Sequence, residues 1–550
     1  MSLFGSLYVG ASGLQTGQNA LNTTAHNLSN VDTKGYTRQQ TLLTDKNYNL
    51  LSVNPKAAAN QQTGLGVTYA DVRQVRDSFL DQKYRKESGR SAFYEVSYNT
   101  LGEVETLLGE LDGESFSESM NDLWEAVQEL AKQPASSVTQ GLLIQRASQF
   151  VEQAGNVYSA LSKYQDNLNN QIKGEVDQIN QYADRLFALN NEIIKIETGG
   201  IERANDLRDE RNQILDALGG YGNISYSEDW NGSVNVKYEG HTLVNATQVF
   251  KVGLDQDSDT GFYTPFWQGD AKKIPQENGT FRYDISNCKV FDLTREISTA
   301  CNTDIGSLKG MLVARGDHRA DYTDLQDADA YNETISSSIL MNVEAEFDNL
   351  VHNIVTKINE VLENAAEKEG PPYLRNEDGT IIQLFQRISC DTYDENGKLI
   401  REDLSAGKEN TLFTISNLVV NPDLVKEPTK LGFVKNDKKE DYAIAQELQA
   451  VFETKAYCLN PNVTTKSNLI DYYSNIVSQV ANTGAVFKSI YENEETTVSS
   501  TDNARQQVVG VSDEEELSNM IKFQNAYNAS SRYINVIDQL LEHIINTLGA

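Results

Sequence analysis

The sequence contains few of the residues from which metal centres and disulfide frameworks are built. Its 550 residues include four cysteines and five histidines. No two cysteines form a Cys-x-x-Cys pair and no two histidines form a His-Glu-x-x-His motif, so neither a structural zinc site nor a zinc-protease site is expected. Four thiols in so long a chain do not make a disulfide framework. We interpret them as small buried or incidental residues and leave one bridge open, Cys288–Cys301.

Motifs for other catalytic chemistry are absent as well. There is no Gly-x-Ser-x-Gly nucleophile elbow, and Gly64-Leu65-Gly66 lacks the third glycine of a dinucleotide-binding loop. We therefore nominate no catalytic, cofactor-binding or metal-binding residue, expect no cofactor and do not expect an enzyme.

Basic residues and long apolar runs are also scarce. The chain has 47 basic against 79 acidic residues and a net charge of −32, which argues against nucleic-acid binding because that function needs a basic face. No apolar run approaches the roughly 20 residues that span a membrane, so membrane insertion is not expected. The first basic residue is Lys34, so the N-terminus lacks the basic region of a cleaved secretory signal. Taken alone, this indicates a cytoplasmic protein.

Both ends of the chain, by contrast, carry an apolar stripe in which steps of three and four residues alternate. Such spacing places a narrow seam along a helix, as in a coiled coil. The N-terminal stripe contains glycines, each costing a helix about 1 kcal/mol relative to alanine, so this helix should need a partner. The stripes consist of Leu3, Leu7, Gly10, Leu14, Gly17, Leu21, Thr24 and Leu28, and of Met520, Phe523, Tyr527, Ser530, Ile534, Ile537, Leu541, Ile544 and Leu548.

The C-terminal helix is better specified than the N-terminal one. Ser512 and Glu515 have the spacing of a capping box, and residues 513–516 are all acidic, as the helix dipole favours in a first turn. Seams reserved at both termini are more typical of an assembly subunit than of an enzyme. The alternative is an ordinary amphipathic terminal helix docked on its own domain.

Between the stripes, the apolar period changes along the chain. From about 76 to 218 it is helical, with Ser117 as the expected cap of one helix and a second, very long helix expected over about 137–198. Alternating residues such as Ser233–Tyr238 then predict β-structure, a helical stretch returns over about 320–366, and Asn-Gly and Asp-Gly turns predict hairpins farther on.

These changes predict a mainly α protein with β-rich insertions, in which terminal coiled-coil helices, a long helical bundle stem and outer β domains are nested. We expect removal of about 221–435 to leave the stem helices folded. The predicted parts are residues 1–35 with 511–550 (terminal coiled-coil core), 36–220 with 436–510 (helical bundle stem with an extended linker), 221–320 (β-rich outer domain), 321–370 (a helical segment continuing the stem) and 371–435 (a small mixed insertion).

The stripes also carry recognisable motifs. Ala25-His26-Asn27-Leu28-Ser29-Asn30-Val31-Asp32-Thr33-Lys34-Gly35-Tyr36 resembles the N-terminal signature of bacterial flagellar rod, hook and hook-associated proteins, although Lys34 stands where that family often has proline. Thr37-Arg38-Gln39 resembles the hook-associated protein 1 branch. Other segments of the chain are also similar to that family. They are Gly510-Val511-Ser512-Asp513-Glu514-Glu515, Gln524-Asn525-Ala526-Tyr527, Gly64-Leu65-Gly66-Val67 with Arg76-Asp77-Ser78-Phe79-Leu80, and Ala204-Asn205-Asp206-Leu207-Arg208-Asp209-Glu210-Arg211.

The resemblance implies a structural subunit of the bacterial flagellum that joins hook to filament and self-assembles, as a ring or helix, through its terminal helices. It implies an extracellular location, reached through the flagellar type III apparatus without a cleaved signal peptide. The implied partners are other copies of the chain, the hook protein, the second hook–filament junction protein and an export chaperone for the C-terminal segment.

The candidate assembly interface follows from the stripes and the signature together. Asn27 and Asn30 could cap or end the first helix, and Arg38 could pair with a carboxylate of a neighbouring subunit or remain solvated. The candidates are Leu3, Leu7, Leu14, Leu21, Leu28, Asn27, Asn30, Gly35, Tyr36, Arg38, Phe523, Tyr527, Ile534, Ile537, Leu541, Ile544 and Leu548.

Two alternative functions stay open. One is a flagellar hook or rod protein, and the helical region from about 76 to 218 argues against it because a hook protein is mostly β outside its termini. The other, of a different class, is a flagellar stem whose outer residues 221–435 carry an enzymatic activity.

Overall fold

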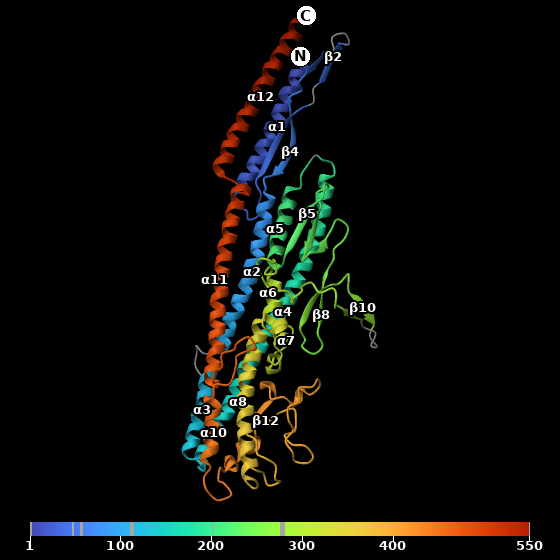
Figure 1. Cartoon of the computed structure of the whole chain (residues 1–550). Coiled ribbons are helices and arrows are strands. Elements are labelled where there is room, and N and C mark those ends of the chain that lie inside the picture. Colours follow the sequence, from blue (N-terminus) through green and yellow to red (C-terminus); the bar gives the residue numbers. More distant parts are fainter. Residues whose placement is uncertain are drawn as a thin grey trace.

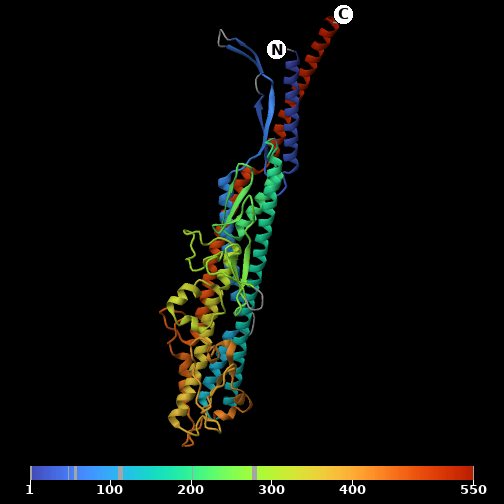
Figure 2. The same cartoon turned by 90° about the vertical axis from the view of Figure 1, so that its right-hand side faces the viewer.

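The computed structural model describes residues 3–46, 49–54, 59–109, 115–200, 202–275 and 281–548. It is an elongated, mainly helical rod with both termini at the same end (Figure 1). A pair of terminal helices forms that end, long helices form the stem, and small β-sheets and loops lie against the stem (Figure 2). The predicted fold class is confirmed.

The terminal end of the rod consists of two helices and an extended linker. Helix α1 (Leu3–Ser29) lies side by side with α12 (Asp513–Leu548), and the two run in opposite directions (Figure 1). After α1 the chain forms four strands that make two antiparallel pairs, β1 (Gln39–Asp45) with β4 (Val67–Gln74), which also packs on α1, and β2 (Asn49–Asn54) with β3 (Ala59–Thr63).

Eight longer helices build the stem. The longest, α4, has 61 residues and matches the helix expected over about 137–198; it contains no proline and repeats buried apolar residues at steps of three and four. These positions form the spine of the main hydrophobic core. The stem helices are α2 (Ser78–Leu107), α3 (Phe116–Lys132), α4 (Ser137–Glu197), α5 (Asn205–Tyr221), α6 (Ser307–Arg315), α8 (Ile339–Glu369), α10 (Tyr442–Glu453) and α11 (Leu469–Val509).

The start of α3 differs from the expected cap at Ser117. The cap is Ser115, whose hydroxyl oxygen accepts a hydrogen bond from the Glu118 amide at 3.1 Å. The reason is Phe116, which is fully buried among other aromatic rings. Beginning the helix at Phe116 places that side chain on the buried face, a tertiary constraint that local capping preference does not contain.

Short strands lie along one side of the stem. Val234, Val236 and Tyr238 point inward against α4 while the residues between them face outward, which confirms the alternation seen in the sequence. The antiparallel sheets are β5 (Ile224–Glu228), β6 (Val234–Tyr238) and β7 (His241–Val244); β8 (Val252–Gln256) and β9 (Tyr263–Trp267); β10 (Lys272–Pro275) and β11 (Phe281–Asp284); and β12 (Phe385–Arg387) and β13 (Leu418–Val420).

Short helical turns connect these parts. They are η1 (Tyr322–Leu325), α7 (Ala328–Ala330), η2 (Tyr331–Ile335), η3 (Glu409–Thr411), η4 (Ile415–Asn417), α9 (Pro422–Lys426) and η5 (Pro428–Leu431). All four cysteines are free, with Cys288 buried and Cys301 exposed, so the bridge left open between them is not formed.

The packing of two helices from the middle of the chain argues against its removal as a single insertion. After the β-strands the chain returns to the stem at α6, which packs on α2 and α4, and at α8, which packs on α10 and α11. Excision of 221–435 would take both helices out of the main core, so we now expect it to unfold the stem. The change of period near residue 220 marks an excursion from the stem. The helical segment expected to continue the stem at 321–370 contains α8, whereas α6 already lies before that segment.

An aromatic cluster at the far end of the stem should contribute strongly to stability. The ring of Phe116 lies 4.8 Å from that of Phe347 and 4.9 Å from that of Tyr473. Replacing Phe116 by Ala should lower the free energy of unfolding by about 3–5 kcal/mol, since the cavity would be fully buried. Urea unfolding followed by circular dichroism measures this loss. Phe79→Ala, at a site 70% exposed, is the control and should change stability by less than about 0.5 kcal/mol; equal losses would contradict the assignment.

Candidate assembly interface

The contact between α1 and α12 is centred on glycines. Gly10 and Gly17 are buried, and a side chain added at Gly10 would lie 2.6 Å from Ile534 Cγ1. A Cβ at Gly17 would lie 3.4 Å from the Tyr527 Cα atom, so the two backbones approach closely there. The glycines weaken α1 as an isolated helix. Its close antiparallel packing on α12 gives it the partner that we expected it to need.

The C-terminal seam faces α1 as its spacing indicated. Ile537 is 5% exposed, and six other seam residues of α12 are half-buried; they are Met520, Phe523, Tyr527, Ser530, Ile534 and Leu541. Ile544, near the end of the helix, is exposed. The side chains of Leu3 and Leu548 lie outside the described part of the chain.

Apolar side chains remain partly or fully exposed to solvent on both helices of the pair. On α1 the leucines flank the glycine contact, and Leu7, Leu14, Leu21 and Leu28 are only half-buried. On α12 a second set of apolar residues is exposed, comprising Leu517, Ile521, Tyr533, Val536, Leu540, Ile544 and Ile545. Extended apolar surface of this kind on a folded chain marks an interaction site.

The base of the helix pair is held by Asn27, which is 1% exposed near the end of α1. Its amide nitrogen donates to the Gln39 carbonyl at 2.8 Å, and its carbonyl oxygen accepts from the Gln39 amide at 3.0 Å. The Tyr36 hydroxyl donates to the same oxygen at 2.7 Å. Asn27 thus bonds the end of α1 to the first residue of β1 as a neighbouring strand would, in place of a local helix cap.

The turn between α1 and β1 depends on backbone geometry. Asn30 donates from its side chain to the His26 carbonyl at 3.0 Å, which helps to end the helix. Gly35 has φ +82°, a conformation that favours glycine, and a side chain there would collide with Gln213. Lys34, which replaces the proline common in the family, accepts a hydrogen bond from Gln213 through its carbonyl. This hydrogen bond holds the turn against α5, even though Lys34 departs from the family pattern.

Arg38 joins three parts of the chain. Its backbone amide donates to the Val509 carbonyl at the end of α11, at 2.8 Å. Its guanidinium contacts Glu516 at 2.8 Å and Glu515 at 2.8 Å, both in the first turn of α12. The Glu516 carboxylate is almost fully buried, so this pair is screened less than a surface pair. Arg38 therefore finds two carboxylates on its own chain.

Thr37 connects this turn to the stem. Its buried amide donates to Asp209 Oδ2 at 3.1 Å, and Arg76 donates to its hydroxyl at 3.0 Å. Gln74 also donates to Asp209, at 2.7 Å. Burial raises the pKa of Asp209 to about 6, against the opposing effect of these donors. We call the contacts of Asn27, Gly35, Tyr36, Thr37, Arg38, Asp209 and Glu516 the latch.

Below the latch, an ion cluster binds α2, α5 and α11 together. Arg505 on α11 contacts Asp216 on α5 at 2.6 Å and lies over the ring of Tyr84 at 3.9 Å. Arg85 on α2 contacts the same Asp216 at 2.7 Å. Because both arginines are nearly buried and share one carboxylate, the cluster fixes the three helices relative to each other. The latch is therefore attached to a rigid base.

Sequence reasoning identified part of the latch. Asn27, Gly35, Tyr36 and Arg38 were nominated, and the structure brings them together. Thr37, Asp209 and Glu516 were not nominated, although Thr37 and Asp209 lie in motifs that had been singled out and Glu516 lies in the acidic first turn of the C-terminal helix. Their partners are separated by as many as 478 residues along the chain, as for Arg38 and Glu516, and no local spacing encodes such a pairing.

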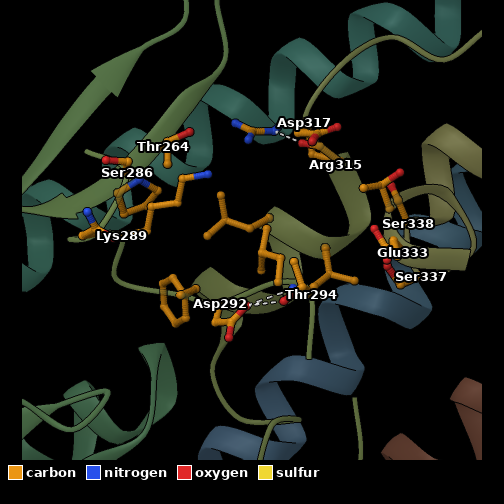
Figure 3. A pocket seen from close by; sticks show the side chains of 18 residues that line it. Thr264, Ser286, Lys289, Asp292, Thr294, Arg315, Asp317, Glu333, Ser337 and Ser338 are labelled. Atoms are coloured by element: carbon orange, nitrogen blue, oxygen red, sulfur yellow. Dashed lines mark hydrogen bonds between the residues drawn. The ribbon is translucent and has the colours of Figure 1, made fainter. Parts of the chain in front are cut away.

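A cleft of about 380 Å³ lies where the outer strands meet α6 (Figure 3). Its floor is apolar, and two of its charged groups have partners: Arg315 donates to Asn169 and to the Tyr263 carbonyl, and Asp292 accepts from Thr294. No histidine or cysteine lines it. Within the described residues, no three His, Cys, Asp or Glu side chains are arranged as metal ligands, and no described helix is long and apolar enough to cross a membrane. The cleft offers nothing that favours an enzymatic outer domain.

The latch gives a direct test of the joint. Replacing Asn27 by Ala removes both partners of Gln39 and the acceptor of Tyr36, and should lower stability by about 1–3 kcal/mol because a polar group loses its hydrogen bond. Hydrogen exchange at the amides of Arg38 and Gln39 should then accelerate while exchange in α4 stays unchanged. Asn22→Ala, at an exposed position of the same helix, should do neither. Unchanged exchange at Gln39 in the Asn27 variant would refute the role of the latch.

Comparisons with known proteins place these features in a family. The profile described as "Flagellar hook-associated protein FlgK helical domain" matches residues 101–372, "Flagella basal body rod protein" matches residues 7–37, and "Flagellar basal body rod FlgEFG protein C-terminal" matches residues 507–547. The two terminal matches cover most of α1 and α12 and include five of the latch residues, which are Asn27, Gly35, Tyr36, Thr37 and Glu516.

Similar full-length proteins carry one description. The chain is 26% identical to "Flagellar hook-associated protein 1" of Bacillus subtilis (strain 168), over 100% of this chain and 99% of that protein. It is 24% identical to the protein of the same description in Escherichia coli (strain K12), over 97% and 98%. A solved structure of the flagellar hook junction protein FlgK from Burkholderia pseudomallei has the same fold, with a TM-score of 0.54 at 12% identity, covering 78% of this chain and 100% of that one. The chain therefore belongs to the flagellar hook-associated protein 1 family, the structural, non-enzymatic proteins of the hook–filament junction.

Proposed function

We propose that the chain works by self-assembly, in which α1 and α12 of each copy pack against the same helices of neighbouring copies to form the inner part of a tube. The observation that carries this proposal is the apolar surface left open on the helix pair. It comprises the half-buried leucines of α1 and the exposed apolar residues of α12, from Leu517 to Ile545. Burying such surface stabilises an assembly by about 25 cal/mol per Å² of apolar area.

The arrangement of the rod supports this orientation. The termini lie together at one end, and the stem with its β-sheets extends away from them (Figures 1 and 2). A tube built from the helix pairs would leave the stem and the outer strands on its exterior. The hook protein would contact one end of the tube and the second hook–filament junction protein the other, in a flagellum outside the cell. The latch would transmit force between the tube and the stem.

Export is proposed to occur through the flagellar type III apparatus without a cleaved signal peptide, with a chaperone bound to the C-terminal seam beforehand. In the folded chain the side chains of Ile534 and Ile537 face α1. The chaperone and α1 would then compete for the same residues. A chain bound to its chaperone would be unable to form the helix pair, which would prevent assembly in the cytoplasm.

The alternative of a hook protein loses its support in the structure. The region from about 76 to 218 distinguishes a hook protein from a hook-associated protein, because a hook protein is expected to be mostly β there. It consists of α2, α3, α4 and α5 joined by short segments. This stem of helices matches the helical-domain profile of the hook-associated family.

Assembly through the leucine flank of α1 can be tested in a strain that lacks this protein. Electron microscopy should show hooks without filaments in that strain, and expression of the wild-type chain should restore filaments. Leu21→Asp should fail to restore them, because a charge would be buried between copies, while the melting temperature of the soluble protein should change little since Leu21 is only half-buried in the single chain. Asn22→Asp, with the same charge at an exposed position, should restore them. Filaments on hooks of the Leu21→Asp strain would refute the proposal.

The chaperone proposal predicts a loss of affinity that is specific to the seam. Changing Ile534 and Ile537 together to Asp should abolish binding of the export chaperone in calorimetry, because the apolar contact would be replaced by two charges. Ile545→Asp is the matched control, as this residue is 67% exposed and lies off the seam; it should bind as the wild type does. If the double variant kept its affinity, the chaperone would have to bind elsewhere.

A further inference from the structure

Helix α8 carries three acidic residues inside the stem. Glu344 and Glu346 are fully buried and Asp348 is 1% exposed. Because the three lie within five residues of a helix, Glu344 and Asp348 share one face and Glu346 points away from it. Among the described residues, no lysine, arginine or histidine forms an ion pair with Glu344 or Asp348. Buried carboxylates without a paired cation are unusual, since burial of a bare charge is strongly unfavourable.

The surroundings of Glu344 leave one of its oxygens without a donor. Its Oε2 accepts from Gln165 Nε2 at 3.0 Å and from the Ala320 amide at 3.2 Å. Its Oε1 is buried and has no hydrogen-bond partner, and the same is true of Gln165 Oε1. A proton on Glu344 would supply an O–H donor where two buried acceptors lack one.

The cations nearest to Glu344 are already bound to other carboxylates. His318 contacts Asp317 at 2.7 Å and Asp324 at 3.2 Å, and Arg319 contacts Asp166 at 3.0 Å. Arg315, whose carbonyl accepts from Gln165, is held by Asn169 on α4 and by backbone carbonyls. Neither the helix α4 nor the segment after α6 therefore brings a free positive charge to Glu344.

Asp348 faces mainly groups of its own sign. It accepts from the Ile415 amide at 2.7 Å and from the Tyr322 amide at 3.0 Å, so it attaches two separate loops to α8. Asp321 and Glu402 face it from those loops, and the hydroxyl of Tyr158 faces it from α4. His352 approaches Glu402 at 3.6 Å. Burial lowers the pKa of His352, which favours the neutral ring.

We propose that Glu344 and Asp348 hold protons in the folded stem at neutral pH, and that their ionisation in alkaline solution releases the segment 320–325 and the loop at Ile415 from α8. The carboxyl groups bond directly to the backbone amides of Ala320, Tyr322 and Ile415. A charge on either group would be buried beside other acids, so the favoured response is to open these contacts to water. The proposal concerns the stem alone and does not depend on the assembly mechanism.

The direction of the pH effect follows from the two carboxyl groups. Burial raises the pKa of Glu344 to about 8 and that of Asp348 to about 8, from an ordinary range near 4. A group whose pKa is higher in the folded than in the unfolded chain stabilises the fold fully below the unfolded pKa, and this stabilisation is lost as the pH rises through the folded pKa. Stability should therefore fall as the pH rises from about 4 to about 8, and the upper part of this fall lies within the range from pH 6 to pH 9. Burial also raises the pKa of Glu346, to about 7, which acts in the same direction.

His318 does not cancel this effect. Its hydrogen bonds to Asp317 and Asp324 raise its pKa to about 10, so the ring stays charged through most of this window. By the same rule, the stabilisation that it contributes is fully present below its unfolded pKa of about 6.5 and falls as the pH rises from there to about 10. It too makes the folded chain less stable in alkaline solution.

The test compares the full chain with a variant that cannot ionise at these positions. The urea midpoint of the wild type should fall from pH 6 to pH 9, and in Glu344→Gln/Asp348→Asn this fall should shrink by about half or more, since amides mimic the protonated groups. Glu363→Gln is the control: it lies on the same helix, but its carboxylate pairs with Arg401, and the wild-type fall should remain. A double variant that falls as steeply as the wild type, or a wild type with no fall, would overturn the proposal.

Two measurements on the wild type keep the test decisive if the double variant does not fold. Infrared titration should show the C=O stretch of protonated carboxyl groups at neutral pH, disappearing as the pH rises towards 9. Hydrogen exchange, corrected for its intrinsic pH dependence, should show loss of protection at Ala320, Tyr322 and Ile415 over the same range, with α4 still protected. No protonated carboxyl band at neutral pH would refute the proposal, as would retained protection of those three amides at pH 9.

Discussion

The close antiparallel contact of α1 and α12 is the constraint on which the rest of the terminal region depends. Glycine at positions 10 and 17 brings the two backbones together, and this displaces the larger side chains to the flanks of the contact. A seam of leucines in the same place would have filled the space between the helices and left little apolar surface outside. The glycines thus have two effects: they make α1 depend on α12, and they leave Leu14 and Leu21 available to other molecules.

Much of the fold could be predicted from the sequence because it is encoded locally. The length of α4 follows from apolar spacing without proline, ended at Gly199-Gly200, and β6 follows from alternation over residues 234–238. The segment 321–370, which contains α8, was expected to continue the stem, but α6 fell within the predicted β-rich domain 221–320. The placement of α6 in the stem could not be predicted, since its helical pattern is the same whether it lies inside the stem or in an outer domain. The cap at Ser115 was missed for a related reason, as it is decided by the burial of Phe116 among rings from α4, α8 and α11.

The residues of the candidate interface likewise fall into those that could be predicted from the sequence and those that could not. Asn27, Gly35, Tyr36 and Arg38 belong to a short signature, so they could be nominated together before their contacts were known. Asp209 and Glu516 are ordinary acidic residues in helical segments, and only the fold shows that they accept hydrogen bonds from Thr37 and Arg38. The acidic first turn of α12 was explained by the helix dipole alone. The structure adds that its one buried member, Glu516, is the part that fixes α12 to the stem.

The latch also explains how a joint made of few residues can hold a defined angle between the stem and the helix pair. Between stem and helix pair the chain passes twice, through residues 75–77 and through residues 510–512, and neither segment has a core of its own. The turn of residues 30–38 lies beside both, since Arg38 bonds to Val75 and to Val509 through its backbone. Rigidity there has to come from directed bonds: an amide pair at Asn27, a backbone bond from Arg38 to Val509, and a nearly buried ion pair to Glu516. Such bonds fix direction because they weaken steeply when their geometry is distorted. Apolar contacts tolerate sliding, whereas this joint has a defined angle, which a subunit needs if its outer domains are to sit at one radius of a tube.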